Sequence, residues 1–197
     1  LSYSQKRLWA LQNLDEKSFA YNTPNNYILI GNLNIDAFND SFEELFKRHE
    51  ALRTRFIVID GKPFQKIIAP NFEFFKVIAL TDGQIDDYLR IENERYFDLE
   101  KDILFRVILI KVLPTKHILH INMHHIISDG WSMEIIEKEV MLMYGAAIQM
   151  TANPLKPIAF QYKDFSQWHN TIISADKDKN SLKEFWLQKL SDDLPAL

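Results

Sequence analysis

The chain has 197 residues, 47% of them apolar, and a formal net charge of −4 at pH 7. This length and apolar content exclude an intrinsically disordered segment, and the absence of cysteine excludes disulfides, a thiolate nucleophile and a cysteine metal site. Because basic and acidic residues are interspersed without a basic patch, we expect neither nucleic acid nor a membrane surface as a partner.

The first quarter of the chain is expected to alternate helices and strands. Residues 4–14 are predicted to form a short helix and residues 15–24 a loop before a strand at 27–34. The inward side chains of that helix are expected to be Leu8, Trp9 and Leu11. The clearest helix covers residues 36–50, where apolar side chains recur on one face with the period of a helix. These side chains are Phe38, Phe42, Leu45, Phe46 and His49.

Three strands are predicted next. Residues 52–60 alternate in polarity as a strand does, Asp60 and Gly61 are a hairpin turn signal, and residues 63–69 supply the partner strand. Residues 72–80 are predicted to form a further strand.

The second half of the chain continues the alternation. A helix is predicted at 83–97, and two apolar strands at 103–113 and 116–123 are joined by Pro114-Thr115. A second strong helix is predicted at 132–149, with one apolar stripe made of Ile136, Val140, Met143, Tyr144 and Ala147.

The remaining residues are expected to cross the domain and end in two helices. Residues 151–159 contain two prolines and form the crossing segment, followed by helices at 160–174 and 180–190. The side chains that these helices are expected to bury are Phe165, Trp168, Ile172, Leu182, Phe185, Trp186 and Leu190.

Helices that interleave with strands and hairpins predict an α/β architecture, a mixed sheet flanked by helices. No apolar stretch approaches the roughly 18 residues of a membrane span, and no signal peptide opens the chain. A cysteine-free chain fits the reducing cytoplasm, which is the compartment that we expect. Since the first residue is Leu1 rather than methionine, we expect a piece of a longer protein.

Two adjacent histidines, His124 and His125, end the last predicted strand. Each could simply be a half-buried histidine with its hydrogen bonds satisfied. A metal site with Asp129 has the right atom types, but adjacent strand residues point to opposite faces and no further ligand converges there. For the same reason we expect one histidine to face the core and the other to face outward.

The third possibility is acid–base chemistry. Asp129 and Gly130 form a turn, and Ser132 is the predicted N-cap of the following helix. The N–H groups at that helix start would lie beside a histidine, the pairing that acyl transfer requires. Asp129 is expected to form an ion pair with Arg53 or Arg55 that fixes the turn.

Four segments of the chain carry the residues of a known pattern. The stretch "MHHIISDGWS" (123–132) contains His-His-x-x-x-Asp-Gly. It is accompanied by "LSYSQKRLWAL" (1–11), "RHEALRTRF" (48–56) and "YKDFSQWHN" (162–170). In these residues and in their order, the chain resembles the condensation domains of nonribosomal peptide synthetases. The matching side chains of the first and last motifs are Ser4, Gln5, Arg7, Leu8, Trp9, Tyr162, Asp164, Phe165 and Trp168.

The resemblance implies a chloramphenicol acetyltransferase-like fold, in which two related halves form a V around an active-site tunnel. All four motifs belong to the first half. Residues 1–197 are therefore expected to be the N-terminal subdomain, with the C-terminal half absent and the isolated half inactive.

The resemblance also implies a reaction and its partners. An upstream peptidyl carrier protein would deliver an acyl or peptidyl thioester, and a downstream one the aminoacyl acceptor, next to an adenylation domain. Both substrates would arrive on phosphopantetheine arms, so no cofactor is bound directly. His125 is the implied catalytic residue. His124, Asp129, Gly130 and Arg53 are its implied supports, with Arg53 favoured over Arg55 as the partner of Asp129.

Gly130 would let the backbone approach the substrate, or would serve only the geometry of the turn. Trp9, Trp168 and Trp186 are expected in the core, and Tyr162 and Asp164 are expected to be structural. Three other functions remain open from the sequence: an epimerization domain, an ester-forming acyltransferase of the same superfamily, and a carrier-docking half without turnover.

Overall fold

The computed structural model describes residues 1–71, 73–175 and 179–191, and its centre is a four-stranded sheet with the order β1-β6-β5-β4. The strands are β1 (Asn22–Ile30), β4 (Phe75–Ala79), β5 (Phe105–Leu113) and β6 (Lys116–His124). β4 runs parallel to β5, and the other neighbours are antiparallel. The prediction of a mixed sheet is therefore confirmed.

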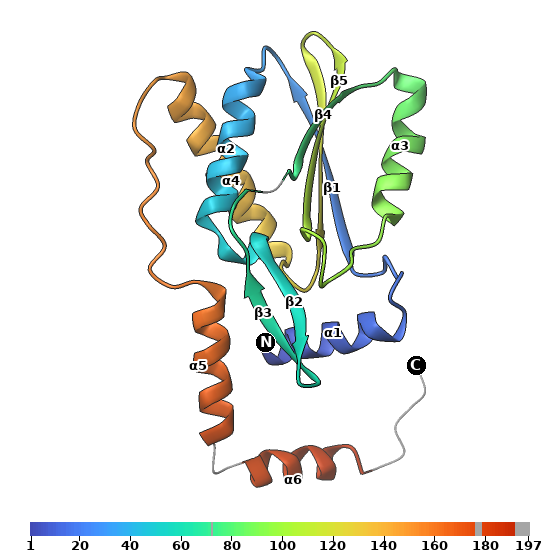
Figure 1. Ribbon diagram of the computed structural model, residues 1–197, viewed down its shortest axis with the longest axis vertical. Helices are drawn as coiled ribbons and strands as arrows, with labels where there is room; N and C mark the ends of the chain where they lie inside the picture. The colour runs from blue at the N-terminus through green and yellow to red at the C-terminus, as the bar shows by residue number, and fades with distance from the viewer. Residues whose placement is uncertain (72, 176–178, 192–197) are drawn as a thin grey trace.

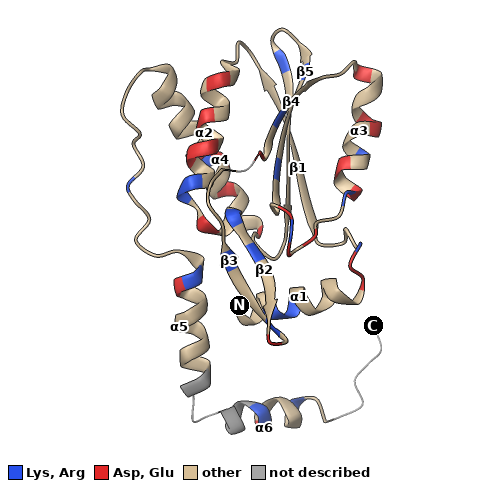
Figure 2. Ribbon diagram, in the orientation of Figure 1, with Lys and Arg blue, Asp and Glu red and all other residues tan. Residues whose placement is uncertain are grey.

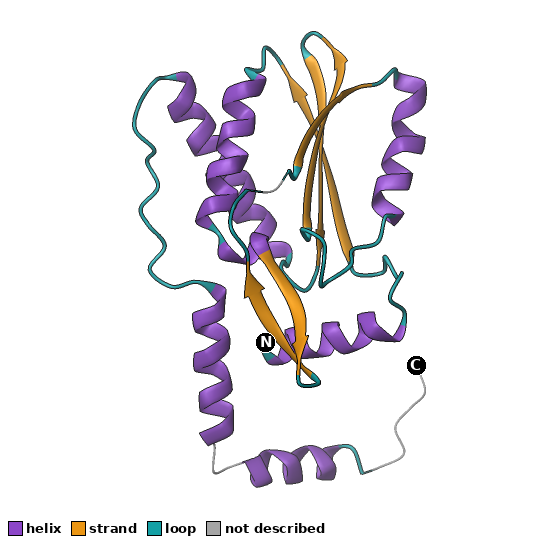
Figure 3. Ribbon diagram, viewed as in Figure 1, coloured by secondary structure: helices purple, strands orange, loops and turns teal. Residues whose placement is uncertain are grey.

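Helices cover both faces of this sheet (Figures 1 and 3). α2 (Ile35–Arg48) and α4 (Gly130–Ile148) pack side by side on one face, and α3 (Asp82–Glu94) covers the other. The main core lies between α2, α4 and the odd-numbered residues of β5 and β6. Its buried members include Phe38, Phe42, Leu45, Phe46, Phe105, Val107, Leu109, Ile121, Met123, Ile136, Val140 and Met143.

α2 forms where the sequence predicts it because two local features agree. Its apolar residues share one face, which the sheet and α4 bury. Asn34 caps the N-terminus by accepting the N–H of Ala37 at 3.1 Å. His49 is the C-cap rather than a core residue.

The predicted hairpin is confirmed as β2 (Thr54–Ile59) and β3 (Lys62–Ile67), preceded by the 3₁₀ turn η1 (Glu50–Arg53). Its two turn residues have positive φ angles, 49° at Asp60 and 74° at Gly61, as a two-residue hairpin turn requires.

α1 (Tyr3–Leu14) lies across the end of the sheet (Figure 1). Its buried face carries Gln5 and Gln12, while Leu8 and Trp9 are half-buried and pack on a second core cluster. That cluster consists of Phe56, Phe97, Leu99, Leu104 and Ile126.

The first strand begins five residues earlier than predicted, at Asn22, and ends at Ile30 rather than at residue 34. Asparagine and proline, which make up residues 22–26 apart from Thr23, have low strand propensity, but the hydrogen-bond ladder with β6 extends the strand as far as the pair Asn22 and His124. β1 is an edge strand, which tolerates Pro24.

The last two helices, α5 (Tyr162–Ala175) and α6 (Lys179–Lys189), form as predicted, but the prediction that they bury their aromatic residues is wrong. Trp168 is 59% exposed and Trp186 57% exposed, and α6 lies apart from the sheet (Figure 1). Periodicity identifies an apolar helix face but not what covers it. Phe165, Ile172, Phe185 and Leu190 are exposed as well, and the side chain of Leu182 lies outside the described part.

Charged residues of both signs are spread over the elements (Figure 2). Within the described ranges, no helix is both long enough and apolar enough to cross a bilayer.

Candidate functional site

The two adjacent histidines point in opposite directions, as the strand geometry predicts. β6 ends at His124, whose side chain is fully buried on the α3 side of the sheet. His125 is exposed, and its backbone N–H donates to the carbonyl of Tyr21 at 2.8 Å. One imidazole therefore belongs to the interior and the other is available to a ligand.

His124 is held by hydrogen bonds on both ring nitrogens. Nδ1 accepts the backbone N–H of Ile126 at 3.0 Å, and Nε2 lies 3.2 Å from Oε1 of Gln12. Burial lowers the pKa of His124 to about 4, and the proximity of His125 adds to the effect. The ring of His124 is therefore neutral near pH 7.

His125 lines a cavity of about 640 Å³. One wall comes from α1, another from the turn and the first part of α4, and a third from residues 158–162. The lining combines apolar side chains with about as many polar ones. Its members are Ser4, Gln5, Leu8, His49, Ala51, His125, Ile126, Ile127, Ser128, Asp129, Trp131, Ser132, Ile135, Ile158, Phe160, Gln161 and Tyr162.

Two motifs distant in sequence meet at this cavity. The hydroxyls of Ser2 and Tyr162 lie 2.9 Å apart, and Asn170 donates to the carbonyl of Leu1 at 2.8 Å. Asp164 accepts the backbone N–H of Gln161 at 2.8 Å at the start of α5. Tyr162 and Asn170 thus join α5 to the start of the chain, while Asp164 makes a structural contact within the start of its own helix.

The N-cap of α4 is Asp129, not Ser132 as predicted. The Asp129 carboxylate accepts the backbone N–H of Ser132 at 2.9 Å and its hydroxyl at 2.7 Å, and the Ser132 hydroxyl accepts the N–H of Asp129 at 3.1 Å. This is a reciprocal capping box. The N–H of Ser132 is therefore occupied and cannot stabilise an oxyanion.

Replacing Asp129 by alanine is expected to lower the free energy of unfolding by about 1 kcal/mol at pH 7, because the cap is lost. The Asp129→Asn variant keeps an acceptor and should lose less. Urea denaturation of the full chain measures both. Equal losses in the two variants would contradict a capping role.

The same carboxylate should make stability depend on pH. Hydrogen bonds from the Ser132 hydroxyl and then from its backbone N–H lower the pKa of Asp129 below its usual value. Its stabilisation is therefore complete above the unfolded pKa of about 3.9 and is lost as the pH falls through the folded pKa. Below about pH 4, the wild-type chain should lose stability more steeply than the Asp129→Asn variant.

Gly130 opens α4 with no requirement of its own for glycine. Its φ angle is outside the left-handed region, and an added Cβ would meet no atom within 4 Å. The turn geometry therefore does not explain this glycine. Close approach of a substrate stays a prediction.

The predicted ion pair between Asp129 and Arg53 is wrong. Arg53 donates from Nη1 to the carbonyl of Ile68 at 2.7 Å, and its Nη2 lies 3.7 Å from Glu50. Arg53 thus ties η1 to the end of β3. The carboxylate of Asp129 needs no arginine partner, because the N–H and hydroxyl of Ser132 at the start of α4 already donate to it.

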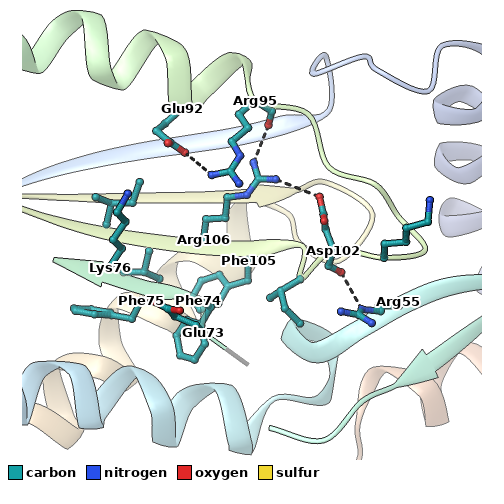
Figure 4. Close-up of a pocket in the computed structure, with 14 residues that line it drawn as sticks. Arg55, Glu73, Phe74, Phe75, Lys76, Glu92, Arg95, Asp102, Phe105 and Arg106 are labelled. Carbon is teal, nitrogen blue, oxygen red and sulfur yellow. Dashed lines mark hydrogen bonds and ion pairs between the residues drawn. The ribbon is translucent and has the colours of Figure 1, made fainter. Parts of the chain in front are cut away.

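Arg55, the other candidate partner, lines a different cavity of about 340 Å³, shown in Figure 4. Its Nε donates to the carbonyl of Asp102 at 3.3 Å. In the same cavity, Arg106 donates to the Arg95 carbonyl at 2.8 Å and lies 3.5 Å from the Asp102 carboxylate. Burial lowers the pKa of Arg106 to about 10. These charges are engaged with one another, so this cavity is less suited to a reaction than the one at His125.

Three residues near the site were not assigned a role from the sequence. Gln5 and Gln12 form the polar stripe of α1, and a glutamine repeated on the inward face of a helix is the signal that could have identified them. Glu139 of α4 accepts from Nε of Arg48 at 3.0 Å and lies 2.6 Å from Nε2 of His49, which lines the cavity. No pattern in the sequence pairs positions 49 and 139.

The described residues contain no cluster of three or more histidines, aspartates or glutamates that could hold a metal ion. What the site does offer is one exposed imidazole, which can accept a hydrogen bond or a proton, in a cavity of mixed polar and apolar lining.

Comparisons with known proteins agree with this picture. The family model described as Condensation domain matches residues 1–197. Bacitracin synthase 3 of Bacillus licheniformis is 36% identical over 197 residues, which are 100% of this chain and 3% of that protein. Surfactin synthase subunit 2 of Bacillus subtilis (strain 168) is 35% identical over 197 residues, 100% of this chain and 5% of that protein.

Solved structures share the fold. The complex of the X-domain and OxyB from teicoplanin biosynthesis matches with a TM-score of 0.89 at 25% identity, over 100% of this chain and 44% of that chain. The starter condensation domain of the rhizomide synthetase RzmA matches with a TM-score of 0.86 at 22% identity, over 98% and 48%. The chain thus spans less than half of these solved chains and a few per cent of the curated relatives.

Proposed function

This chain belongs to the condensation domain family of nonribosomal peptide synthetases, and on that basis we propose that it is the N-terminal half of a domain that forms amide bonds. The donor is an acyl or peptidyl thioester on one carrier protein, and the acceptor is an aminoacyl thioester on another. Both arrive on phosphopantetheine arms as substrates. The C-terminal half supplies the opposite wall of the cavity.

The reaction transfers an acyl group from sulfur to nitrogen. The acceptor amine attacks the thioester carbonyl, a C–N bond forms, and the C–S bond breaks. The proton that the nitrogen loses ends on the departing thiolate. The only residue that we assign to this chemistry is His125, which faces the cavity and can accept a hydrogen bond from the amine or from the adduct.

Orienting the amine is the larger part of the role that we propose for His125. An α-amine has a pKa of about 7.7–8.0, so roughly a tenth or more of it is already neutral at pH 7. A thioester is also a reactive acceptor. Orientation can supply roughly 7–11 kcal/mol in favourable cases, while a general base contributes about 10²–10⁴-fold. We therefore infer that His125 acts mainly by holding the amine in line with the carbonyl.

The observation that carries the proposal is the separation of the two histidines, with one sealed and neutral and the other exposed in the cavity of about 640 Å³. Exposed apolar side chains around the cavity support the proposal that the C-terminal half forms its opposite wall. Trp131 is 75% exposed and Phe160 81% exposed, and both line it. Side chains of this kind normally contact a partner or a ligand.

A reconstitution assay tests the proposed function. This chain is mixed with a loaded donor carrier and a loaded acceptor carrier, with and without the C-terminal half, and the carriers are analysed by mass spectrometry. With both halves we expect the acyl mass to leave the donor carrier and appear on the acceptor carrier; with this chain alone we expect none. Fragmentation should place the new bond on nitrogen.

Three outcomes would contradict the proposal. Transfer to oxygen would indicate an ester-forming acyltransferase. An inverted α-carbon without transfer would indicate epimerization. Carrier binding without any product would indicate that this chain is a carrier-docking half without turnover.

A further inference from the structure

The backbone on both sides of His125 is fixed by three hydrogen bonds. The N–H of His125 donates to Tyr21, and the carbonyl of Ile126 accepts Nε2 of Gln5 at 3.3 Å. The N–H of Ile126 donates to Nδ1 of His124 at 3.0 Å. These bonds hold the peptide planes before and after His125, and hence the direction of its side chain.

One of the three bonds depends on where His124 carries its proton. A neutral imidazole has one N–H and one acceptor nitrogen, so Nδ1 can accept from Ile126 only when the proton is on Nε2. With the proton on Nδ1 instead, the ring N–H of His124 would face the backbone N–H of Ile126, and no hydrogen bond could form between them. The position of the Ile126 peptide therefore depends on the His124 tautomer, which the partner of Nε2 on the opposite side of the ring determines.

Gln12 decides that choice. Its Nε2 donates to backbone carbonyls of the loop after α1, at 3.0 Å to Ser18 and 3.3 Å to Glu16. Carbonyls only accept, so the amide can face them only with its nitrogen. Its oxygen, an acceptor, must then face Nε2 of His124, which has to donate.

We propose that Gln12 is a positioning residue for His125, acting through the tautomer of His124 and the peptide of Ile126. Gln12 is 3% exposed and His124 fully buried, so bulk water has little access to substitute for either hydrogen bond. The relay joins Gln12 to the peptide beside His125 by two hydrogen bonds, one from Gln12 to His124 and one from Ile126 to His124. The proposal rests on the function proposed above for its effect on rate, but its hydrogen bonds can be observed without any reaction.

The first arm of the test is nuclear magnetic resonance of the wild-type chain. We expect His124 to carry its proton on Nε2, and a scalar coupling across the hydrogen bond between Nδ1 of His124 and the amide nitrogen of Ile126. A proton on Nδ1, or no such coupling, overturns the inference. This arm needs no variant, so it decides the question even if the substitution below prevents folding.

The second arm uses Gln12→Met, which keeps the size of the side chain and removes its hydrogen bonds. In the two-lobed domain, meaning this chain together with the C-terminal half, we expect kcat for amide formation to fall about tenfold with KM nearly unchanged, because a small misplacement of a reacting group is costly. In the variant, His124 should populate both tautomers and the coupling should weaken.

Asn13→Met is the matched control. Asn13 is the next residue of α1, is exposed, and donates to the Trp9 carbonyl of its own helix at 2.9 Å. We expect it to leave both kcat and the His124 spectrum unchanged. A Gln12→Met domain with the kcat of the wild type overturns the inference. A wild-type domain that forms no amide overturns the proposed function instead, while the spectra still decide the tautomer.

Discussion

Replacing His125 by alanine is expected to lower the rate of amide formation by the two-lobed domain about 10²–10⁴-fold, the range of a general base or a comparable positioning group. The His125→Gln variant should keep part of the activity, since its side-chain oxygen can still accept a hydrogen bond from the amine. Single-turnover measurement of acyl transfer between loaded carriers gives both rates.

The glutamine variant distinguishes the two roles of the histidine. If placement dominates, it should be faster than the alanine variant across the pH range. An equally deep loss in both, with acceptor binding unchanged, would show that His125 removes a proton and would contradict the positioning role. Since His125 is exposed and its backbone bonds do not involve its ring, neither substitution should alter the fold.

Replacing Phe105 by alanine is expected to lower the free energy of unfolding by about 3–5 kcal/mol. Phe105 is 0% exposed in the middle of the main core, with ring centroids 5.4 Å from Phe74 and 6.4 Å from Phe42 and Phe46. The loss combines the lost burial of the ring with the cavity that it leaves. Urea denaturation of the full chain, followed by circular dichroism, measures it.

Phe19→Ala is the control for that experiment. The substitution is chemically the same, but Phe19 lies in the loop after α1 and is 49% exposed. We expect it to change the free energy of unfolding by less than about 1 kcal/mol. Similar losses in the two variants would mean that the layer between the sheet and α2 is not the main source of stability.

The parts of the fold that could be predicted from the sequence are those where one local pattern determines both the element and its burial. α2 shows this, with its apolar face at helical spacing, and so does the hairpin around Gly61. The start of β1 could not be predicted, because Asn22 to Asn26 become a strand only through pairing with β6. The exposure of Trp168 and Trp186 was missed because it depends on what lies beyond the helix.

The candidate site divides in the same way. The opposite orientations of His124 and His125 follow from strand geometry alone. The role of Asp129 as a cap was missed because the predicted helix started two residues too late, which freed the carboxylate for an ion pair that does not form. Gln12 could not be assigned, because its partner lies 112 positions away.

The contact between the hydroxyls of Ser2 and Tyr162 bears on the order of events during translation. The two residues are 160 positions apart, so at about 5–20 residues per second the ribosome needs roughly 10–30 s to deliver the second after the first. α1 leaves the ribosome before the strands of the sheet, yet α5, which contacts the start of the chain, leaves it only after them. The pocket around His125 is therefore completed only after every strand of the sheet that carries it has been synthesised.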